Sequence, residues 1–517
     1  MNDLSVKRVV IVGGGTAGWM TAALLSRAWG RQLDIRLIES DEIGIVGVGE
    51  ATIPQIRHVA RFLGIDEDEL LRASRGTIKL AVQFNDWRRI GDSYLHAFSD
   101  VGLPLGLLPF QHYWLRDVQG RASAAGAGAA SRRESSEAPG LWAYSINAQA
   151  AEGNRFARMD HVGSSPLTGI RYAYHFDAAR FGQLLRGHAE KCGVVRTEGK
   201  VVDVALRGSD GFIESVKLEC GEVVAGDLFI DCSGFRGLLI EGALKTGYES
   251  WQHWLPCDRA VVVASEHGDT IRPYTQASAQ SAGWQWRIPL QHLASNGHVY
   301  GSRFISDDEA TATLLHHLEG PALGEPRQLR FHTGIRNQVW NRNCIAMGLA
   351  SGFIEPLEST SIHLMQSAVS RLLTLFPDRR FDPALIAEYN RQTRAEYVQT
   401  RDFIVLHYKA TERDDTPFWR ERAGMAIPDG LAHRIELFRR NAHIFREGEE
   451  LFTEMGWLQV MIGQGIVPER YHALADALPQ AQLDEFLGNI RTLVGRAVAT
   501  MPSHAEFIAT HFREVPA

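Results

Sequence analysis

Residues 8–39 read RVVIVGGGTAGWMTAALLSRAWGRQLDIRLIE. A short apolar run, typical of a buried strand, is followed by glycines, a helix-like segment and a second strand-like run. Gly13, Gly15 and Gly18 have GxGxxG spacing, and Glu39 stands 21 residues after Gly18. Strand, glycines, helix, strand and acid in this order predict a dinucleotide-binding unit of a doubly wound α/β fold.

Each residue of this unit has a physical reason to be there. Gly13 permits the tight turn after the strand, Gly15 lets the backbone approach a pyrophosphate, and Gly18 lets helix and strand pack closely. The helix N-terminus presents free N–H groups to the anion. The carboxylate of Glu39 can accept a hydrogen bond from a ribose hydroxyl.

The rest of the chain favours FAD as the dinucleotide. One such unit in 517 residues leaves no separate site for a nicotinamide partner. Residues 40–54, SDEIGIVGVGEATIP, are glycine-rich and read either as a mobile strap over a flat cofactor or as an ordinary flexible loop. Residues 226–237, GDLFIDCSGFRG, predict a strand that ends in a tight turn, which would be a second anchor for FAD.

Composition excludes several classes of protein. The net charge is −7 and the pI is about 6.3, so the chain has no basic footprint for a nucleic acid. Five scattered cysteines without a CxxC pair argue for reduced thiols and against a zinc site, and no metal site is predicted. The N-terminus lacks the pattern of a secretory signal, and no apolar run spans a membrane. We therefore expect a cytoplasmic protein that binds no membrane.

The pattern changes along the chain. Residues 119–139 are rich in Ala, Gly and Ser without hydrophobic periodicity, which predicts a flexible surface insertion. Residues 257–303 are β-rich, and helical spacing begins near residue 361. We expect a discontinuous FAD-binding core over 1–380 and a helical, substrate-covering part over 381–517.

Residues 283–290 read GWQWRIPL, which puts Trp284 and Trp286 on one side of an extended segment. The simple interpretation is a strand whose two indoles fill a core. The alternative is a stiff wall between two compartments, since tryptophan buries a large area with only two side-chain torsions.

The fingerprint, GVGEATIP at 47–54, GWQWRIP at 283–289 and FIEPLEST at 353–360 together resemble the flavin-dependent tryptophan halogenase family, from residue 8 to about 420. The resemblance implies an FAD-binding, Rossmann-like sheet of the flavin monooxygenase type. It also implies FADH2 from a separate flavin reductase, O2, and chloride or bromide. The flavin hydroperoxide would oxidise the halide to hypohalous acid, which crosses a tunnel to a small, indole-type aromatic substrate.

The resemblance also assigns roles. Lys79 and Glu358 match the catalytic pair, the backbone amides of Thr360 and Ser361 match the halide site, and Trp284 and Trp286 become the barrier between flavin and substrate. Two further sets are matched. The substrate-sandwiching residues are His96 and Phe98, and the added flavin contacts are Thr16, Ala17, Gly47, Val48, Val201, Leu349 and Ile362.

The side-chain chemistry of Lys79 and Glu358 is compatible with these catalytic roles. A buried Lys79 would have a lowered pKa and could donate a hydrogen bond to hypohalous acid or form a haloamine. The alternative is an ordinary surface lysine. Glu358 could stabilise the cationic ring intermediate and help to remove its proton, or it could be an ordinary acid before a helix that is capped by Ser359 or Thr360.

Two departures from the family pattern concern specificity. Ser361 stands where the family usually has glycine, which leaves the choice between chloride and bromide open. The family members that act on free tryptophan carry an adjacent tyrosine pair, and this chain aligns Arg440 and Asn441 there. Free tryptophan, bare indole and a larger indole derivative therefore all remain candidate substrates.

Other functions stay open at this stage. A flavin monooxygenase would hydroxylate its aromatic substrate without halide, and an FAD-dependent cyclase or isomerase would turn over without O2. A flavin-binding protein without enzymatic activity would need neither Lys79 nor Glu358. Whether the chain forms a homodimer is left open by its sequence.

Overall fold

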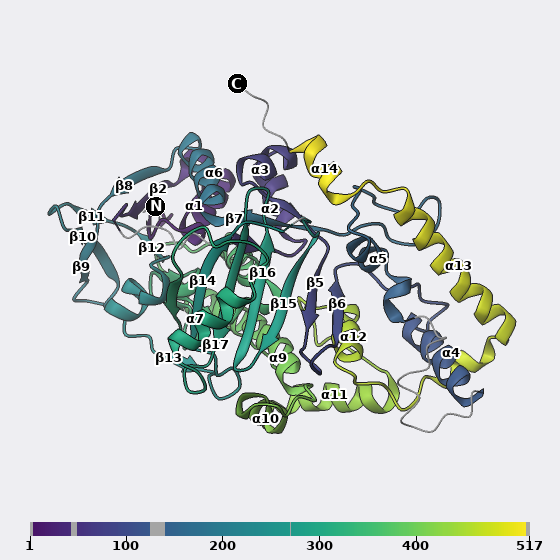
Figure 1. Ribbon diagram of the computed structural model, residues 1–517. Helices are drawn as coiled ribbons and strands as arrows, with labels where there is room; N and C mark the ends of the chain where they lie inside the picture. The colour runs from purple at the N-terminus through teal and green to yellow at the C-terminus, as the bar shows by residue number, and fades with distance from the viewer. Residues whose placement is uncertain (1–3, 43–48, 125–139, 269, 513–517) are drawn as a thin grey trace.

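The dinucleotide-binding unit forms as its sequence predicts. In the computed structural model, which describes residues 4–42, 49–124, 140–268 and 270–512 (Figure 1), β1 (Arg8–Val12) and β2 (Asp34–Glu39) are parallel neighbours. The helix α1 (Thr16–Trp29) connects them. Four of the five β1 residues are buried because helices cover the sheet: α1 packs against α6 (Ala178–Lys191) and α8 (Ser361–Thr374).

The first sheet has six strands in the order β20-β21-β12-β1-β2-β8. Every neighbouring pair is parallel except β20 with β21. The strands not yet introduced are β8 (Val195–Glu198), β12 (Leu228–Asp231), β20 (Trp340–Asn341) and β21 (Cys344–Ala346). The predicted strand at 226–237 is therefore confirmed as β12, and it lies beside β1, where its following turn borders the glycine loop.

The β-rich middle section is confirmed as part of a seven-stranded sheet in the order β18-β14-β17-β16-β15-β5-β6. Its strands are β5 (Ala81–Asn85), β6 (Ser93–Ala97), β14 (Arg259–Ser265), β15 (Tyr274–Gln280), β16 (Gly283–Pro289), β17 (Ala294–Tyr300) and β18 (Arg327–Arg330). The parallel pair β15–β5 joins two segments that are far apart in the chain.

A smaller sheet, β3-β7-β4, packs against β15, β16 and β17 of this one, and its strand β4 carries the buried Lys79. Its strands are β3 (Gly49–Ala51), β4 (Thr77–Lys79) and β7 (Ala173–Asp177). Two further three-stranded sheets contain β9 (Val201–Leu206), β10 (Ile213–Leu218), β11 (Val223–Ala225), β13 (Tyr248–Ser250), β19 (Gly334–Arg336) and β22 (Gly352–Phe353).

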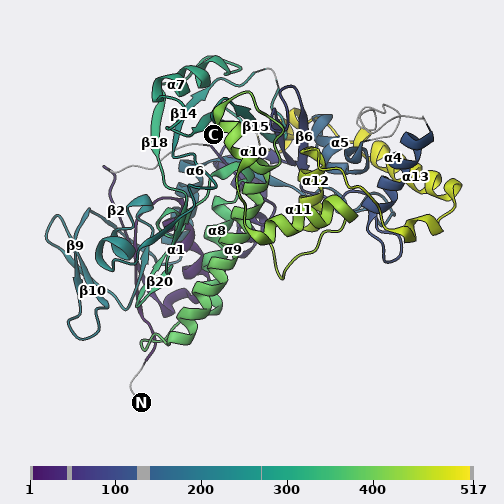
Figure 2. The same ribbon diagram turned by 90° about the horizontal axis from the view of Figure 1, so that it is seen from below.

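The helical C-terminal part is also confirmed (Figure 2). It contains α9 (Pro383–Lys409), α10 (Pro417–Gly424), α11 (Asp429–Asn441), α12 (Glu454–Gly463), α13 (Gln480–Ala499) and α14 (His504–His511). The remaining helices are α2 (Ile56–Leu63), α3 (Glu67–Ala73), α4 (Phe110–Ala124), α5 (Ile146–Glu152) and α7 (Asp307–His316). α12 packs on β6, and α13 packs on α5 and α4.

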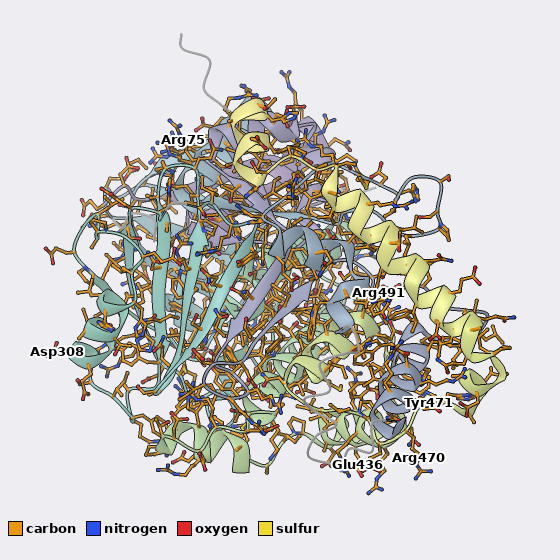
Figure 3. All side chains as sticks on the ribbon, turned by 45° about the vertical axis from the view of Figure 1, so that its right-hand side comes forward. Arg75, Asp308, Glu436, Arg470, Tyr471 and Arg491 are labelled. Atoms are coloured by element: carbon orange, nitrogen blue, oxygen red, sulfur yellow. The ribbon has the colours of Figure 1, made fainter. Side chains whose placement is uncertain are left out.

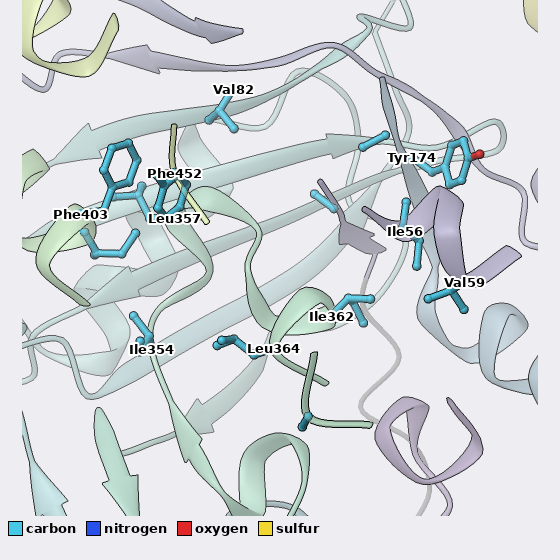
Figure 4. Packing of buried hydrophobic residues seen from close by; sticks show 14 of the residues in the cluster. Ile56, Val59, Val82, Tyr174, Ile354, Leu357, Ile362, Leu364, Phe403 and Phe452 are labelled. Carbon is cyan, nitrogen blue, oxygen red and sulfur yellow. The ribbon is translucent and has the colours of Figure 1, made fainter. Parts of the chain in front are cut away.

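One boundary prediction is wrong. Residues 119–124 do not belong to a flexible insertion, because α4 continues through Ala124. Residues 125–139 lie outside the described part of the chain. The division into 1–380 and 381–517 stays a prediction, and one hydrophobic core contains residues of both, among them Leu357 and Phe403 (Figure 4). Within the described ranges, no helix has the length and apolarity to cross a bilayer.

Gly15 and Gly18 of the fingerprint differ in the space around them, so their alanine variants form a matched pair. A β-carbon at Gly18 would lie 1.9 Å from the carbonyl oxygen of Gly13, whereas one at Gly15 would meet no atom within 4 Å. We expect Gly18→Ala to lower the free energy of unfolding by about 1–3 kcal/mol through overpacking, and Gly15→Ala to leave it nearly unchanged. Chemical denaturation of the flavin-free protein measures both values. Equal losses in the two variants would contradict the packing role of Gly18.

Candidate active site

A cavity of 1260 Å³ adjoins the glycine loop. This volume exceeds the roughly 300–1,000 Å³ of ordinary small-molecule sites, as an extended dinucleotide requires. Eight of the predicted flavin residues line it: Gly13, Gly15, Thr16, Ala17, Glu39, Val201, Leu349 and Ile362. Gly18 instead packs against Gly13, in keeping with its predicted role. Gly47 and Val48 lie outside the described residues.

The glycine loop fits a pyrophosphate. Gly13 has a φ of 113°, a conformation that side chains disfavour. The position of a β-carbon at Gly15 is open space, so the backbone there is accessible, and α1 begins with no capping side chain on its Ncap residue. At the end of β2, Glu39 accepts hydrogen bonds from Arg196 Nε (2.5 Å) and Trp19 Nε1 (3.3 Å). These contacts fix the carboxylate at the cavity and leave it lone pairs for a ribose.

Lys79 ends β4 and is completely buried, so the surface-lysine alternative is wrong. Its Nζ donates to the carbonyl oxygen of Thr52 (3.0 Å) and to Ser359 Oγ (2.7 Å), and it lies 5.1 Å from the centre of the Phe98 ring. Burial lowers the pKa of Lys79 to about 7, although the nearby charge of Glu358 opposes this shift. The side chain can therefore exist as ammonium or as amine near neutral pH.

The strand of Lys79 is held in place from the far end of the chain. The backbone N–H of Ile78 donates to Nε2 of His504 (3.2 Å), which belongs to α14. Nδ1 of the same imidazole donates to the carbonyl oxygen of Ile271 (2.8 Å). The last helix thus takes part in positioning β4.

Glu358 closes the short 3-10 turn Pro356–Glu358 and is also buried. His96 Nδ1 lies 2.9 Å from both carboxylate oxygens and donates to them, and His407 Nε2 lies 2.9 Å from Oε1. Burial alone would raise the pKa of Glu358, but His96 and His407 outweigh it and lower the pKa to about 2. Glu358 is therefore an anion, and its charge is better suited to stabilising a cation than to taking up a proton.

Ser359 lies between the cavity and Lys79. It lines the cavity, and its hydroxyl accepts the hydrogen bond from Lys79. Of the two predicted capping residues, Thr360 is the N-cap of α8, but its hydroxyl has no hydrogen-bond partner in the described part of the chain. Ser359 has a φ of 61°, and its hydroxyl accepts from Lys79 instead. The first N–H bonded within α8 is that of Leu364, to the carbonyl of Thr360 (2.9 Å), so the first-turn N–H groups, including that of Ser361, remain available to an anion.

Trp284 and Trp286 lie on one face of β16, with ring centres 6.1 Å apart and planes inclined by 55°. They are 1% and 9% exposed, and both line the cavity. The indole N–H of Trp284 donates to Glu355 Oε2 (2.7 Å). The two indoles therefore fill core space and form part of the cavity wall at the same time, so the two sequence interpretations are compatible.

Aromatic side chains from three segments gather near Glu358. The ring centre of Phe403 lies 5.5 Å from His96, 3.8 Å from Phe452 and 4.8 Å from Trp457. His96 also binds Glu358, a contact that the sequence did not reveal.

Arg440 does not join this group. It pairs with Glu436, whose side chain projects at the molecular surface (Figure 3), and its own side chain is 53% exposed.

Several residues of the site were not predicted from the sequence: Thr52, Phe353, Glu355, Pro356 and His407, and Ser359 in its contact with Lys79. All of them except His407 lie within GVGEATIP or FIEPLEST, and these motifs were the signal that could have indicated them. That histidine lies within a long helix, α9, where nothing local distinguishes it.

Comparison with known proteins supports the family resemblance that the sequence motifs indicate. Residues 8–480 match the tryptophan halogenase family. The tryptophan 6-halogenase SttH of Streptomyces toxytricini is 37% identical over 98% of this chain and 99% of its own length, and the tryptophan 7-halogenase RebH of Lentzea aerocolonigenes is 34% identical over 97% and 98%.

Two solved structures of flavin-dependent halogenases share the fold. Xcc4156 from Xanthomonas campestris is 46% identical with a TM-score of 0.93, and the alignment covers 99% of each chain. BrvH from Brevundimonas sp. BAL3 is 42% identical with a TM-score of 0.92, over 99% of this chain and 100% of that one. With the cavity and the buried Lys79 and Glu358, these matches identify the chain as an enzyme of the tryptophan halogenase family, a flavin-dependent halogenase.

Proposed function

We propose that this enzyme uses O2 and chloride or bromide to make hypohalous acid at FADH2 held in the 1260 Å³ cavity, and that Lys79 relays the halogen to an indole-type ring. The observation that carries the proposal is the position of Lys79, which is buried and hydrogen-bonded to a serine on the cavity wall. FADH2, supplied by a separate flavin reductase, would provide the electrons that reduce O2 and so make the halide reactive. The residues Gly13 to Ala17, Glu39, Val201, Leu349 and Ile362 would hold it.

The surroundings of Lys79 suit a relay. Thr52 and Ser359 accept its hydrogen bonds and so fix the direction of Nζ. With a pKa of about 7, the same group can donate a hydrogen bond as ammonium or form a haloamine as amine. Glu358, held as an anion by His96 and His407, would stabilise positive charge that develops on the ring.

The first turn of α8 supports a halide site next to this relay. The N–H groups of Thr360 and Ser361 stand at a helix N-terminus, where backbone donors and the helix dipole favour an anion. Ser361 lines the cavity, so its hydroxyl adds a polar group where glycine would leave space. The choice between chloride and bromide would depend on this position.

The substrate we propose is an indole without a free amino-acid group, or a larger indole derivative. His96 and Phe98 would contact the ring from beside Glu358 and Lys79. Arg440 lies at the surface, and Arg434, which stacks 4.2 Å from the Trp457 ring centre, is already bound at 2.6 and 2.9 Å by Glu450. Neither arginine is therefore free to bind a substrate carboxylate. The helices of 381–517 would cover the substrate.

A flavin monooxygenase remains the second candidate, since the fold alone does not exclude it. Trp284 and Trp286 argue against it because their buried indoles form part of the cavity wall, where they would keep an aromatic substrate away from the flavin. A non-redox cyclase or isomerase would have no use for Lys79 as an acceptor of halogen. Halide-independent product would favour these alternatives.

Lys79→Ala should abolish halogenation. Loss of the relay should reduce product formation by at least about 10²–10⁴-fold, the range for a positioned acid–base group, while flavin oxidation by O2 continues. Mass spectrometry of an indole, tryptophan and phenol panel, with FAD, a reductase, NADH and bromide or chloride, measures the product. Lys409→Ala, which removes a half-buried lysine bonded to the carbonyls of Ala423 and Met425, is the control. Product from Lys79→Ala would refute the relay.

The rate of halogenation should change with an inflection near pH 7, because the pKa of Lys79 is lowered to about 7. A rate that rises with pH through this value indicates the neutral amine and the haloamine route. A rate that falls indicates the ammonium as hydrogen-bond donor. Single-turnover rates between pH 6 and 8.5, with Lys79→Arg as the comparison, measure the profile, and a flat profile would contradict a titrating Lys79.

Ser361→Gly should change halide preference. Removing the hydroxyl from the cavity wall should shift the ratio of chlorinated to brominated product several-fold, with little change in flavin binding. Mass spectrometry after competition between equal concentrations of the two halides measures the ratio. Thr374→Ala, near the other end of α8, where the hydroxyl donates to the carbonyl oxygen of Ser370 in its own helix, should leave the ratio unchanged. An unchanged ratio in Ser361→Gly would show that the serine hydroxyl does not influence the choice of halide.

A further inference from the structure

A second buried glutamate lies three residues before Glu358, and the proposed chemistry does not use it. Glu355 is completely buried, and its Oε2 accepts hydrogen bonds from the indole N–H of Trp284 (2.7 Å) and from the hydroxyl of Tyr408 (2.6 Å). Its Oε1 has no hydrogen-bond partner in the described part of the chain. A carboxyl group in this state is costly, since burial removes its water and one oxygen gains nothing in return.

The hydrogen bond from Trp284 indicates what the buried carboxyl group of Glu355 does. A buried indole N–H needs an acceptor, and the acceptor fixes the orientation of the ring. Trp286 is held differently. Its N–H has no partner among the described residues, and its ring lies against Gly297, its paired residue on β17. A β-carbon at Gly297 would lie 2.2 Å from the Trp286 ring, so only glycine leaves room for the ring there.

Helix α9 connects this arrangement to the proposed catalytic pair. Two adjacent residues of the helix reach the two glutamates: His407 lies 2.9 Å from Glu358, and Tyr408 donates to Glu355. The same helix therefore supports the group that stabilises the ring and the group that orients Trp284. Burial raises the pKa of Glu355 to about 7, and its hydrogen bonds oppose this shift.

We propose that Glu355 and Gly297 are positioning residues that hold Trp284 and Trp286 as a closed wall of the cavity, so that hypohalous acid leaves only toward Lys79. This inference rests on the proposed function. It assigns to Glu355 no contact with flavin, halide or substrate. It predicts that loosening either ring lets oxidant escape without loss of flavin binding.

Glu355→Leu and Glu355→Gln form the first test. Leucine removes the acceptor, whereas the glutamine carbonyl, in the place of Oε2, can accept from both Trp284 and Tyr408. We expect crystal structures of the flavin-free variants to show a displaced Trp284 ring in Glu355→Leu and an unmoved ring in Glu355→Gln. In turnover with bromide, the share of oxidant trapped by monochlorodimedone in solution should rise several-fold in the leucine variant only.

Gly297→Ala is the second test, since it acts on the other ring and keeps Glu355. It should displace Trp286 and raise the trapped share in the same way. Tyr408→Phe, which leaves the Trp284 bond in place, should raise it less than Glu355→Leu.

Two results would overturn the inference. Unmoved rings in Glu355→Leu and Gly297→Ala would refute the positioning role, and displaced rings with an unchanged trapped share would refute confinement by the wall. Failure of the proposed function is distinguishable from both, because the unaltered enzyme would then produce no halide-dependent oxidant at all.

Discussion

The desolvation of Lys79 is the constraint on which the site depends. An amine with a pKa of about 7 needs a water-free position, yet it must remain within reach of a cavity large enough for a dinucleotide. The structure meets both conditions with one hydrogen bond, from Lys79 Nζ to Ser359 Oγ. That bond joins the small sheet, which carries the lysine, to the turn before α8, which carries the glutamate, and so it requires the two to be held in register.

The carboxylate of Glu358, near this bond, has its partners within the protein. The pKa of Glu358 is kept low by His96 from β6 and His407 from α9, although the carboxylate is buried. The two tryptophans of the cavity wall are also fixed from within the protein. The indole N–H of Trp284 bonds to a buried acid, and the ring of Trp286 occupies the space that the absence of a side chain at Gly297 leaves. His407, Glu355 and Gly297 have no proposed contact with the reactants, yet each supports a residue of the proposed site.

Local features were predictable from the sequence, and long-range ones were not. The glycine loop and the alternation of Trp284 and Trp286 follow from short-range geometry, and the structure has both. The start of the insertion was wrong because an Ala-rich segment without hydrophobic periodicity is still compatible with a helix. Of the two predicted capping residues, Thr360 is the N-cap, whereas the hydroxyl of Ser359 bonds to a lysine 280 positions away, a contact that no local pattern reveals. His407 was missed because its role comes from its contact with Glu358, which lies in a turn that is distant in the sequence.

The bond from Ile78 to His504 has a consequence for synthesis of the chain. The amide next to Lys79 finds its side-chain partner in α14, 426 positions later, and Ala81 of β5 pairs with Tyr274 of β15. Such contacts carry a high loop-closure cost, and β4 and β5 can form them only after residues 504 and 274 have been synthesised. The strand that carries Lys79 therefore depends on a helix that is synthesised long after it.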